Sequence, residues 1–521
     1  MSLLLSTEIE NNSKNGGNEF ISQGRLAEIV NETSVKEQLD KCDRKKSKKI
    51  WKLLQIFGLS PTPKADNGKD ATKICGDPSF QRIMAILVLI DRPAKVRLFL
   101  EHQISDDKLP FDRKDVNYHE CFNGWSHLTI SRFLERQAAV IPYYFKQVEK
   151  KNRKPMRLTD HILPFLSFNK YRHNGGTSEI YRVNIHAEQH NFQSPHDSGQ
   201  FIIKQLHGNS RRDIFKREFA VLRRFSNNAH PHIVSLLVAY ECNDSYNFIF
   251  PEAKSTLAEF WRSPTPFPDP ERGEVLLWMI QQCQGLAAGL CQLHRHETES
   301  GQSLLNPDSG LAQKNSKMHG RMKLLYGWHG DIKPENILWF PGSSTNMGTL
   351  KIADFGIAQF SINLRSSRKP LGFSTTYSAP EFSPNPLNLT NALCDVWALG
   401  CVYLEALAWA IGGRKLHGDL IQIKKVCDPG WFGQSSGEEL RTDTFFMSPR
   451  NGLVEKETPY VKPSITEFMA KLRNDERCSD LGRDVLKIVE NDMLVVQIEE
   501  GSIYSRKSDM LITAIDQILN N

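Results

Sequence analysis

The chain has 521 residues, of which 40% are hydrophobic, so it can bury more than one core. Its formal net charge of +6 is modest for this length and does not by itself indicate a nucleic-acid partner. The cysteines are scattered without CxxC pairs, which favours reduced thiols in an intracellular protein over zinc sites. The apolar run from Ile83 to Ile90 is far too short to span a bilayer. We therefore expect a soluble intracellular protein without a membrane segment.

The first 160 residues carry no catalytic pattern. Residues 1–24 are rich in Asn, Ser, Gly and Glu, a composition that predicts a disordered tail. Between residues 25 and 160, apolar residues recur at helical spacing, which predicts a mostly helical region. Its function is unknown, and we interpret it as a regulatory or docking region with a partner of its own.

A basic run lies inside this helical region, between Lys41 and Lys49. Such a run is typical of a nuclear localisation signal or a nucleic-acid patch, but also of the solvated face of a helix. The solvated face is the commoner case, so no clear nucleic-acid binding is expected. The expected localisation is cytoplasmic, with nuclear entry through this run as the alternative.

Strand patterns begin near residue 162 and frame a turn that contains Gly175 and Gly176. Glycine lets backbone amides approach a phosphate closely, without obstruction by a side chain. Ile180 follows this turn. Taken alone, the turn is as typical of an ordinary hairpin as of a phosphate-binding loop.

Two charged residues fall on the apolar faces of the elements that follow. In the predicted strand at 201–206, Lys204 shares a face with Ile202, because alternate strand residues point the same way. In the predicted helix at 212–225, Glu218 lies on the apolar face. A buried carboxylate is costly unless it is paired, so Lys204 is its predicted partner. The alternative is that Glu218 lies at the edge of the face and points to water.

The segment from His329 to Leu338 reads His-Gly-Asp-Ile-Lys-Pro-Glu-Asn-Ile-Leu. It places a carboxylate (Asp331), a cation (Lys333) and an amide (Asn336) close together in the chain. Phosphoryl transfer needs a carboxylate that orients the attacking hydroxyl and accepts its proton, positive charge near the transferred group, and an oxygen ligand for Mg²⁺. The sequence therefore predicts a catalytic loop.

A second carboxylate follows at Asp354, within Asp-Phe-Gly. Apolar runs on both sides of the turn-forming residues 341–348 predict a hairpin. Such a hairpin would bring Asn336 and Asp354 together as metal ligands.

These motifs resemble, in order, those of the eukaryotic-type protein kinases. The Lys-Pro-Glu-Asn form of the loop is typical of the serine/threonine kinases. Ala379-Pro380-Glu381 resembles the end of the family's activation segment, and Asp395-Val-Trp resembles the start of its central buried helix. Gly330 departs from the pattern, because most members have Arg there, usually to hold a phosphorylated activation loop. The N-terminal region loosely resembles those of divergent kinases from filamentous fungi.

The resemblance implies an α+β fold of the bilobal kinase type, with a small β-rich N-lobe at about 162–252 and a large helical C-lobe at about 253–519. A mostly helical region, 25–160, would precede it. Transfer of the γ-phosphoryl of ATP, with Mg²⁺, to Ser or Thr hydroxyls of proteins is the implied activity. The implied nucleotide-binding residues are Gly175, Gly176, Ile180, Ile202, Lys204, Glu218, Phe250, Glu252, Ala253 and Leu338.

The resemblance also assigns roles in the loop. Asp331 would orient the substrate hydroxyl and accept its proton, and Lys333 would steady the γ-phosphate. Asn336 and Asp354 would hold Mg²⁺. Phe250 would be the gatekeeper, with Glu252 and Ala253 offering backbone groups to adenine.

Two alternatives stay open. Small-molecule phosphotransferases often carry His-Gly-Asp in their loop, but they generally lack a counterpart of Lys333 and the Asp-Phe-Gly at Asp354. A catalytically weak pseudokinase scaffold would explain the reduced glycine loop. The presence of Lys204, Asp331 and Asn336 argues against the scaffold.

Overall fold

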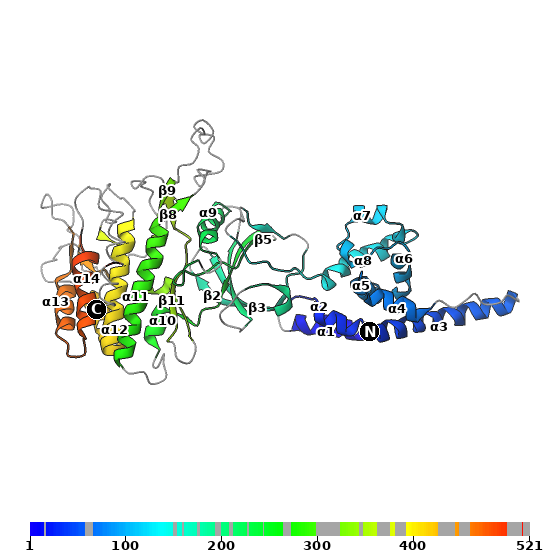
Figure 1. Cartoon of the computed structure of the whole chain (residues 1–521), viewed down its shortest axis with the longest axis horizontal. Coiled ribbons are helices and arrows are strands. Elements are labelled where there is room, and N and C mark those ends of the chain that lie inside the picture. The colour runs from blue at the N-terminus through cyan, green and yellow to red at the C-terminus, as the bar shows by residue number, and fades with distance from the viewer. Residues whose placement is uncertain are drawn as a thin grey trace, which may run out of the picture. The chain divides into compact units, whose positions relative to one another are not determined.

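The computed structural model describes the chain in ranges separated by gaps: 1–14, 17–57, 66–149, 154–158, 161–174, 178–192, 199–207, 212–226, 229–242, 244–263, 272–298, 323–342, 347–361, 376–380, 392–425, 443–447, 459–496 and residue 513. The chain divides into two compact units (Figure 1). The first contains Met1–Val148, Arg153–Asn209 and Leu237–Glu252, and the second contains Glu149–Asn152, Ser210–Leu236 and Ala253–Asn521.

Helices make up the beginning of the first unit. They are α1 (Ser2–Lys14), α2 (Gln23–Ile29), α3 (Glu32–Phe57), α4 (Asn67–Cys75), α5 (Gln81–Leu89), α6 (Val96–Glu101), α7 (Arg113–Tyr118) and α8 (His127–Val140). The apolar run predicted from Ile83 onward becomes α5, the buried centre of this helical core. Asp106 caps α5 from a distance, because its carboxylate accepts the backbone N–H groups of Arg82 and Ile83 at 2.9 and 3.0 Å.

The prediction that residues 1–24 are disordered is wrong. Helix α1 occupies Ser2–Lys14, and Leu5 and Ile9 are buried in the helical core. Phe20 is also fully buried. Average composition hides this order, because a few apolar residues at helical spacing are enough to bury one face of a polar helix.

A sheet of six strands completes the first unit. Its strands are β1 (Met156–Arg157), β2 (Phe165–Asn174), β3 (Ser178–Ile185), β4 (Gln200–His207), β5 (Val238–Cys242) and β6 (Ser245–Pro251), in the order β1-β5-β6-β4-β3-β2. β1 runs parallel to β5, and the other neighbours are antiparallel. One face of the sheet buries an apolar cluster that includes Val183, Phe201, Ile203 and Ile249.

The helices and the sheet belong to one compact unit, whereas the sequence predicted a boundary near residue 160. Phe145 is fully buried in the core of the sheet, and the backbone N–H of Val148 donates to Leu237 at 2.7 Å. Nearer the N-terminus, the Asn18 side chain donates to the carbonyl of Leu163 at 2.7 Å. The predicted boundary therefore cuts through the core of the sheet, because Phe145 and Leu158 lie before it.

The second unit contains mostly helices and short strands. They are α9 (Arg212–Leu222), β7 (Ser255–Thr256), α10 (Leu257–Arg262), α11 (Arg272–His294), β8 (Arg295–Thr298), β9 (Lys323–Trp328), β10 (Ile337–Phe340), β11 (Thr349–Ile352), β12 (Gln359–Ser361), α12 (Ala392–Lys424), β13 (Phe446–Met447), β14 (Tyr460–Val461), α13 (Pro463–Arg473) and α14 (Asp480–Ile488). The predicted mixture of helices and strands is confirmed. Helix α9 groups with this unit, although the sequence placed it in the N-lobe.

Helix α12 is the central element of the second unit. Its backbone leaves helical geometry at Gly413, where φ is 65°. Among the described residues, α12 is the helix that is long and apolar enough to cross a membrane. However, 89% of its most apolar window is buried inside the structure, as expected for a core helix.

Candidate active site

The predicted catalytic residues of the loop come together in the second unit. The Lys333 ammonium lies 2.6 Å from Asp331 Oδ2. The Asn336 amide donates to both the backbone oxygen and Oδ2 of Asp331, each at 2.8 Å. The Asp331 side chain keeps 13% of its surface exposed, so a solvent molecule or substrate can still reach it. The carboxylate is therefore oriented from two sides and remains accessible.

A buried carboxylate, Asp395, holds the backbone of this loop. It lies in the first turn of α12 and is 1% exposed. Its two oxygens accept the backbone N–H groups of His329 and Gly330 at 2.7 and 2.8 Å, and His294 Nε2 donates to it at 2.9 Å. The sequence placed Asp395 at the start of a buried helix but assigned it no part in the site. The sequence did contain a signal for this role. A carboxylate at the start of a nearly continuous apolar helix is buried and therefore needs hydrogen-bond partners.

His329 connects the loop to the Asp-Phe-Gly segment. Its Nε2 donates to the carbonyl of Ala353 at 3.0 Å, and its ring packs edge-on against Phe355 at 5.0 Å between centroids. Phe355 in turn stacks on Phe225, which follows α9. His329 is fully buried, so these contacts fix the position of the residues on both sides of Asp354.

The predicted hairpin is present, and it brings the two expected metal ligands close in the fold. Ile337 in β10 pairs with Ile352 in β11, and the backbone N–H of Ala353 donates to Asn336 at 2.8 Å. Asp354 follows at once, with a left-handed φ of 62°. Non-glycine residues rarely hold this conformation without a structural or functional reason, and such strain concentrates at active sites.

The donor set at this end of the hairpin suits a hard divalent cation. Asn336 uses its amide nitrogen on Asp331, which leaves its oxygen as the atom type that Mg²⁺ prefers. The exposed carboxylate of Asp354 is the second oxygen donor. Within the described ranges no three His, Cys, Asp or Glu side chains gather as a metal site. A Mg²⁺ ion here would thus depend on these two residues together with phosphate oxygens, which is how nucleotide-bound Mg²⁺ is commonly held.

Gly330, which stands where most members of the family have Arg, adopts a backbone conformation that favours glycine. Gly330 has a φ of 83°, in the left-handed region that favours glycine. A Cβ there would also lie 3.4 Å from the side chain of Ile357. The geometry of this loop therefore suits the glycine that the sequence carries.

Four of the predicted nucleotide-binding residues share one face of the sheet in the first unit. Ile180 lies opposite Lys204, and Ile202 lies opposite Phe250, in antiparallel register. Directly opposed residues point to the same side, as do alternate residues of β4. All four side chains are half-buried, whereas Ile203 on the other face is fully buried. The expected alternation of β4 is thus confirmed.

Arg182 is a residue of this face that sequence reasoning missed. It lies opposite Ile202, and its guanidinium is 2.6 Å from the carboxylate of Glu252. The same guanidinium lies 4.3 Å from the centre of the Tyr171 ring. The sequence could have indicated Arg182, because it lies two residues after Ile180 and alternate residues of a strand point to the same side. The pair ties β3 to the segment that was predicted to contact adenine.

The remaining predicted residues are placed as follows. Lys204 belongs to the first unit, while Glu218 lies in α9 of the second and is 1% exposed, so their pairing stays a prediction. Leu338 lies in β10 between Thr256 and Lys351, and Ala253 begins the last segment of the second unit. Gly175, Gly176 and Glu381 lie outside the described residues.

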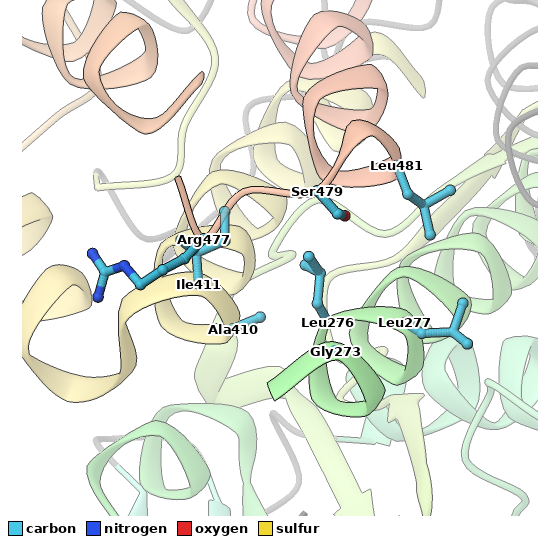
Figure 2. A pocket seen from close by; sticks show the side chains of 8 residues that line it. All are labelled: Gly273, Leu276, Leu277, Ala410, Ile411, Arg477, Ser479 and Leu481. Atoms are coloured by element: carbon cyan, nitrogen blue, oxygen red, sulfur yellow. The ribbon is translucent and has the colours of Figure 1, made fainter. Parts of the chain in front are cut away.

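The second unit also contains an apolar cavity of about 130 Å³. Figure 2 shows the residues that line it: Gly273, Leu276, Leu277, Ala410, Ile411, Arg477, Ser479 and Leu481. The Arg477 guanidinium points away from Leu276 in this view and pairs with Asp475 at 2.6 Å. None of the predicted catalytic residues lines the cavity. It is not the candidate active site.

Comparisons with known proteins agree with these motifs. Residues 319–427 match the protein kinase domain family. The chain is 39% identical over 159 residues to the glycogen synthase kinase-3 homolog YGK3 of Saccharomyces cerevisiae, covering 29% of this chain and 40% of that protein. It is 39% identical over 163 residues to the serine/threonine-protein kinase chk-2 of Caenorhabditis elegans (31% and 33%) and 34% identical over 125 residues to cyclin-dependent kinase E-1 of Arabidopsis thaliana (23% and 26%).

The chain thus spans less than half of the length of these curated relatives. The matched region contains the loop, the hairpin and the start of α12. The predicted resemblance is confirmed: the chain is similar to eukaryotic-type serine/threonine protein kinases, with its kinase-domain match in residues 319–427.

Proposed function

We propose that this protein is a serine/threonine protein kinase that transfers the γ-phosphoryl of Mg-ATP to hydroxyl groups of protein substrates. The observation that carries the proposal is the arrangement of Asp331, Lys333 and Asn336, held by the buried Asp395. The bilobal kinase layout of the two compact units is part of the same proposal.

The roles follow from the contacts of the loop. Asp331, held by Lys333 and Asn336, would orient the substrate hydroxyl and accept its proton. The positively charged ammonium of Lys333 would also interact with the transferred phosphoryl group and steady it. Asn336 and Asp354 would hold the ion, which when bound would neutralise charge on the phosphate oxygens. Because Asp395 fixes the loop backbone in advance, little reorganisation is needed at the moment of reaction.

Nucleotide binding is proposed for the half-buried face of the sheet. Lys204 supplies the positive charge for the phosphates there, and Ile180, Ile202 and Phe250 supply apolar surface for the base. We further propose that the protein acts inside the cell and that the helices of the first unit bind a regulatory partner. Several similar proteins are named cyclin-dependent kinases, which supports a partner of this kind.

The test is phosphate incorporation by the purified full chain with Mg-ATP and a generic Ser/Thr substrate. Asp331→Asn should reduce the rate by about 10²- to 10⁴-fold, because a general base contributes a factor of that order. Asp484→Asn is the matched control, since it removes the same charge from an exposed site on α14 and should leave the rate unchanged. Equal incorporation by Asp331→Asn and the parent chain would reveal a contaminant and refute the assignment. Nucleotide binding without incorporation by either chain would favour the scaffold.

A further inference from the structure

The ion pair between Arg182 and Glu252 spans a strand of the six-stranded sheet. Arg182 lies in β3, Glu252 directly follows β6, and β4 lies between these two strands. Neighbouring strands lie about 4.8 Å apart, so β3 and β6 are about 10 Å apart. The Arg182 side chain bridges this distance, since its Nε and Nη2 atoms each lie 2.6 Å from Glu252 Oε1. The pair therefore crosses over β4 on one face of the sheet.

The face that the pair crosses is the one for which nucleotide binding is proposed. Arg182 lies opposite Ile202, and Ile202 lies opposite Phe250, so these three side chains point to the same side. Lys204 shares this side, because it lies two residues after Ile202 in β4. Ile203 points to the other side, where it is buried in the core of the sheet. Arg182 therefore stands among the residues expected to surround the nucleotide.

Lys204 and Glu252 lie at opposite ends of this face. Lys204 follows Ile202 in β4, whereas Glu252 follows Phe250 in the direction of β6. Because β4 and β6 are antiparallel and Ile202 is paired with Phe250, these two steps lead in opposite directions. A nucleotide with its phosphates at Lys204 and its base against Ile202 and Phe250 would thus place the base between the phosphates and the Arg182 pair.

The guanidinium of Arg182 has a second contact besides the ion pair. Its central carbon lies 4.3 Å from the centre of the Tyr171 ring in β2, a distance typical of a cation–π contact. The Glu252 side chain is 15% exposed and that of Arg182 is 40% exposed. A partly buried pair is less screened by water and salt than a surface pair. The three residues thus connect β2, β3 and the segment after β6 at one end of the face.

We propose that Arg182 is a positioning residue for the nucleobase. By holding Glu252 across β4, it fixes the backbone after β6, which is the segment expected to offer hydrogen-bonding groups to adenine. A segment that is held in place before binding loses less conformational freedom when the ligand arrives, so the ligand binds more tightly. This role rests on the proposed function, and it separates a base end of the site at Arg182 from a phosphate end at Lys204.

The test is titration calorimetry of the full chain with two ligands, Mg-ATP and Mg-tripolyphosphate, the second of which has the phosphates without the nucleoside. Arg182→Gln should weaken ATP binding about 10-fold, because a weakened hydrogen bond to the base costs a factor of up to this order. It should leave the affinity for tripolyphosphate unchanged. Lys204→Gln should weaken the binding of both ligands, since it removes charge from the phosphate end.

Arg157→Gln is the matched control. It also removes an arginine of this sheet that pairs with a glutamate of another strand, because Arg157 in β1 lies 3.2 Å from Glu241 in β5. Both affinities should stay unchanged in this variant. Glu252→Gln should weaken ATP binding as much as Arg182→Gln, and the double variant should lose no more than either, because the two residues act as one pair. Arg182→Lys should keep part of the affinity, since it retains the charge but not the planar guanidinium.

Three results would overturn the role of Arg182 and leave the proposed kinase function standing. They are an unchanged ATP affinity in Arg182→Gln, an equal loss of ATP and tripolyphosphate binding in that variant, and an equal loss of ATP binding in Arg157→Gln. The second would mean that the pair supports the sheet as a whole, and the third would reduce the effect to net charge. Absence of ATP binding by the parent chain would instead refute the nucleotide site itself, and with it both proposals.

Discussion

At the scale of single residues, a glycine in α11 shows how close packing restricts the sequence. The His232 ring occupies the space beside Gly285, where an added Cβ would lie 2.0 Å from His232 Nε2. His232 itself is held, because its Nδ1 donates to the carbonyl of Leu350 at 2.8 Å. The ring therefore cannot move aside without losing this bond.

We expect Gly285→Ala to lower the free energy of unfolding by about 1–3 kcal/mol, the usual cost of overpacking. Gly418→Ala in α12 is the control, because nothing lies within 4 Å of its added Cβ. That substitution should raise the free energy of unfolding by about 0.5–1 kcal/mol through helix propensity. Chemical unfolding of the two variants measures both effects, and a stable Gly285→Ala protein would contradict the packing argument.

His232 also makes stability depend on pH. Burial lowers its pKa from 6.5 to about 4. The unfolded chain therefore binds this proton at higher pH than the folded chain. The contribution of neutral His232 to stability is complete above pH 6.5 and is lost as pH falls from about 6.5 to about 4.

The check is to compare the parent chain with His232→Asn by chemical unfolding across this pH range. The difference in unfolding free energy between them should shrink toward low pH, because only the parent loses this contribution. Other histidines titrate in both proteins and cancel in the difference. A difference that is constant with pH would show that His232 is not the responsible group.

At the scale of elements, a buried ion pair within α12 is contacted by the end of the predicted activation segment. Lys424 Nζ lies 2.6 Å from Glu405 Oε1, and both residues are 1% exposed. Tyr377 donates its hydroxyl to Glu405 Oε2 at 3.0 Å. Lys462 donates to the carbonyl of Lys424 at 2.6 Å, so α13 is connected as well. Burial alone would raise the pKa of Glu405, but the charge of Lys424 and the nearby His417 side chain lower this pKa overall.

Lys424→Met should therefore destabilise the second unit by about 3–5 kcal/mol, because it leaves a buried carboxylate without its counter-charge. The double variant Lys424→Met/Glu405→Gln should recover much of this loss, since it removes both charges. Thermal unfolding of the single and double variants distinguishes the two cases. Equal stability of the single variant and the parent would mean that Glu405 takes up a proton at little cost.

At the scale of the whole molecule, the core of the sheet determines where a stable fragment can begin. A chain that starts at residue 162 loses Phe145, which is fully buried in the core of the sheet, and also β1. Loss of a buried Phe side chain alone costs about 3–5 kcal/mol. We expect this fragment to be insoluble or to expose apolar surface, by contrast with the full chain.

A fragment that starts at residue 141 retains Phe145, Val148 and β1, and serves as the matched comparison. It should be more soluble than the fragment that starts at 162. Binding of a hydrophobic dye and the elution volume in gel filtration measure the difference. Equal behaviour of the two fragments would mean that the sheet does not need the segment before it.

Features that depend on neighbouring residues could be predicted from the sequence. Asp331, Lys333 and Asn336 lie within six positions of one another, so a short loop brings them together. The alternation of β4 and the hairpin before Asp354 follow from local periodicity and turn residues in the same way. The sequence by itself thus determined the loop around Asp331, the family resemblance and the side of the strand that Lys204 shares with Ile202.

Only the tertiary structure decided which distant segments meet. Asp395 holds Gly330 from 65 residues away, and Arg182 reaches Glu252 across 70. Helix α1 forms at the start of the chain because the helical core buries its residues Leu5 and Ile9. The physical reason is that periodicity records the local conformation and the buried face of a segment. The partner that covers this face depends on packing between segments far apart in the chain, and nothing in the segment itself specifies it.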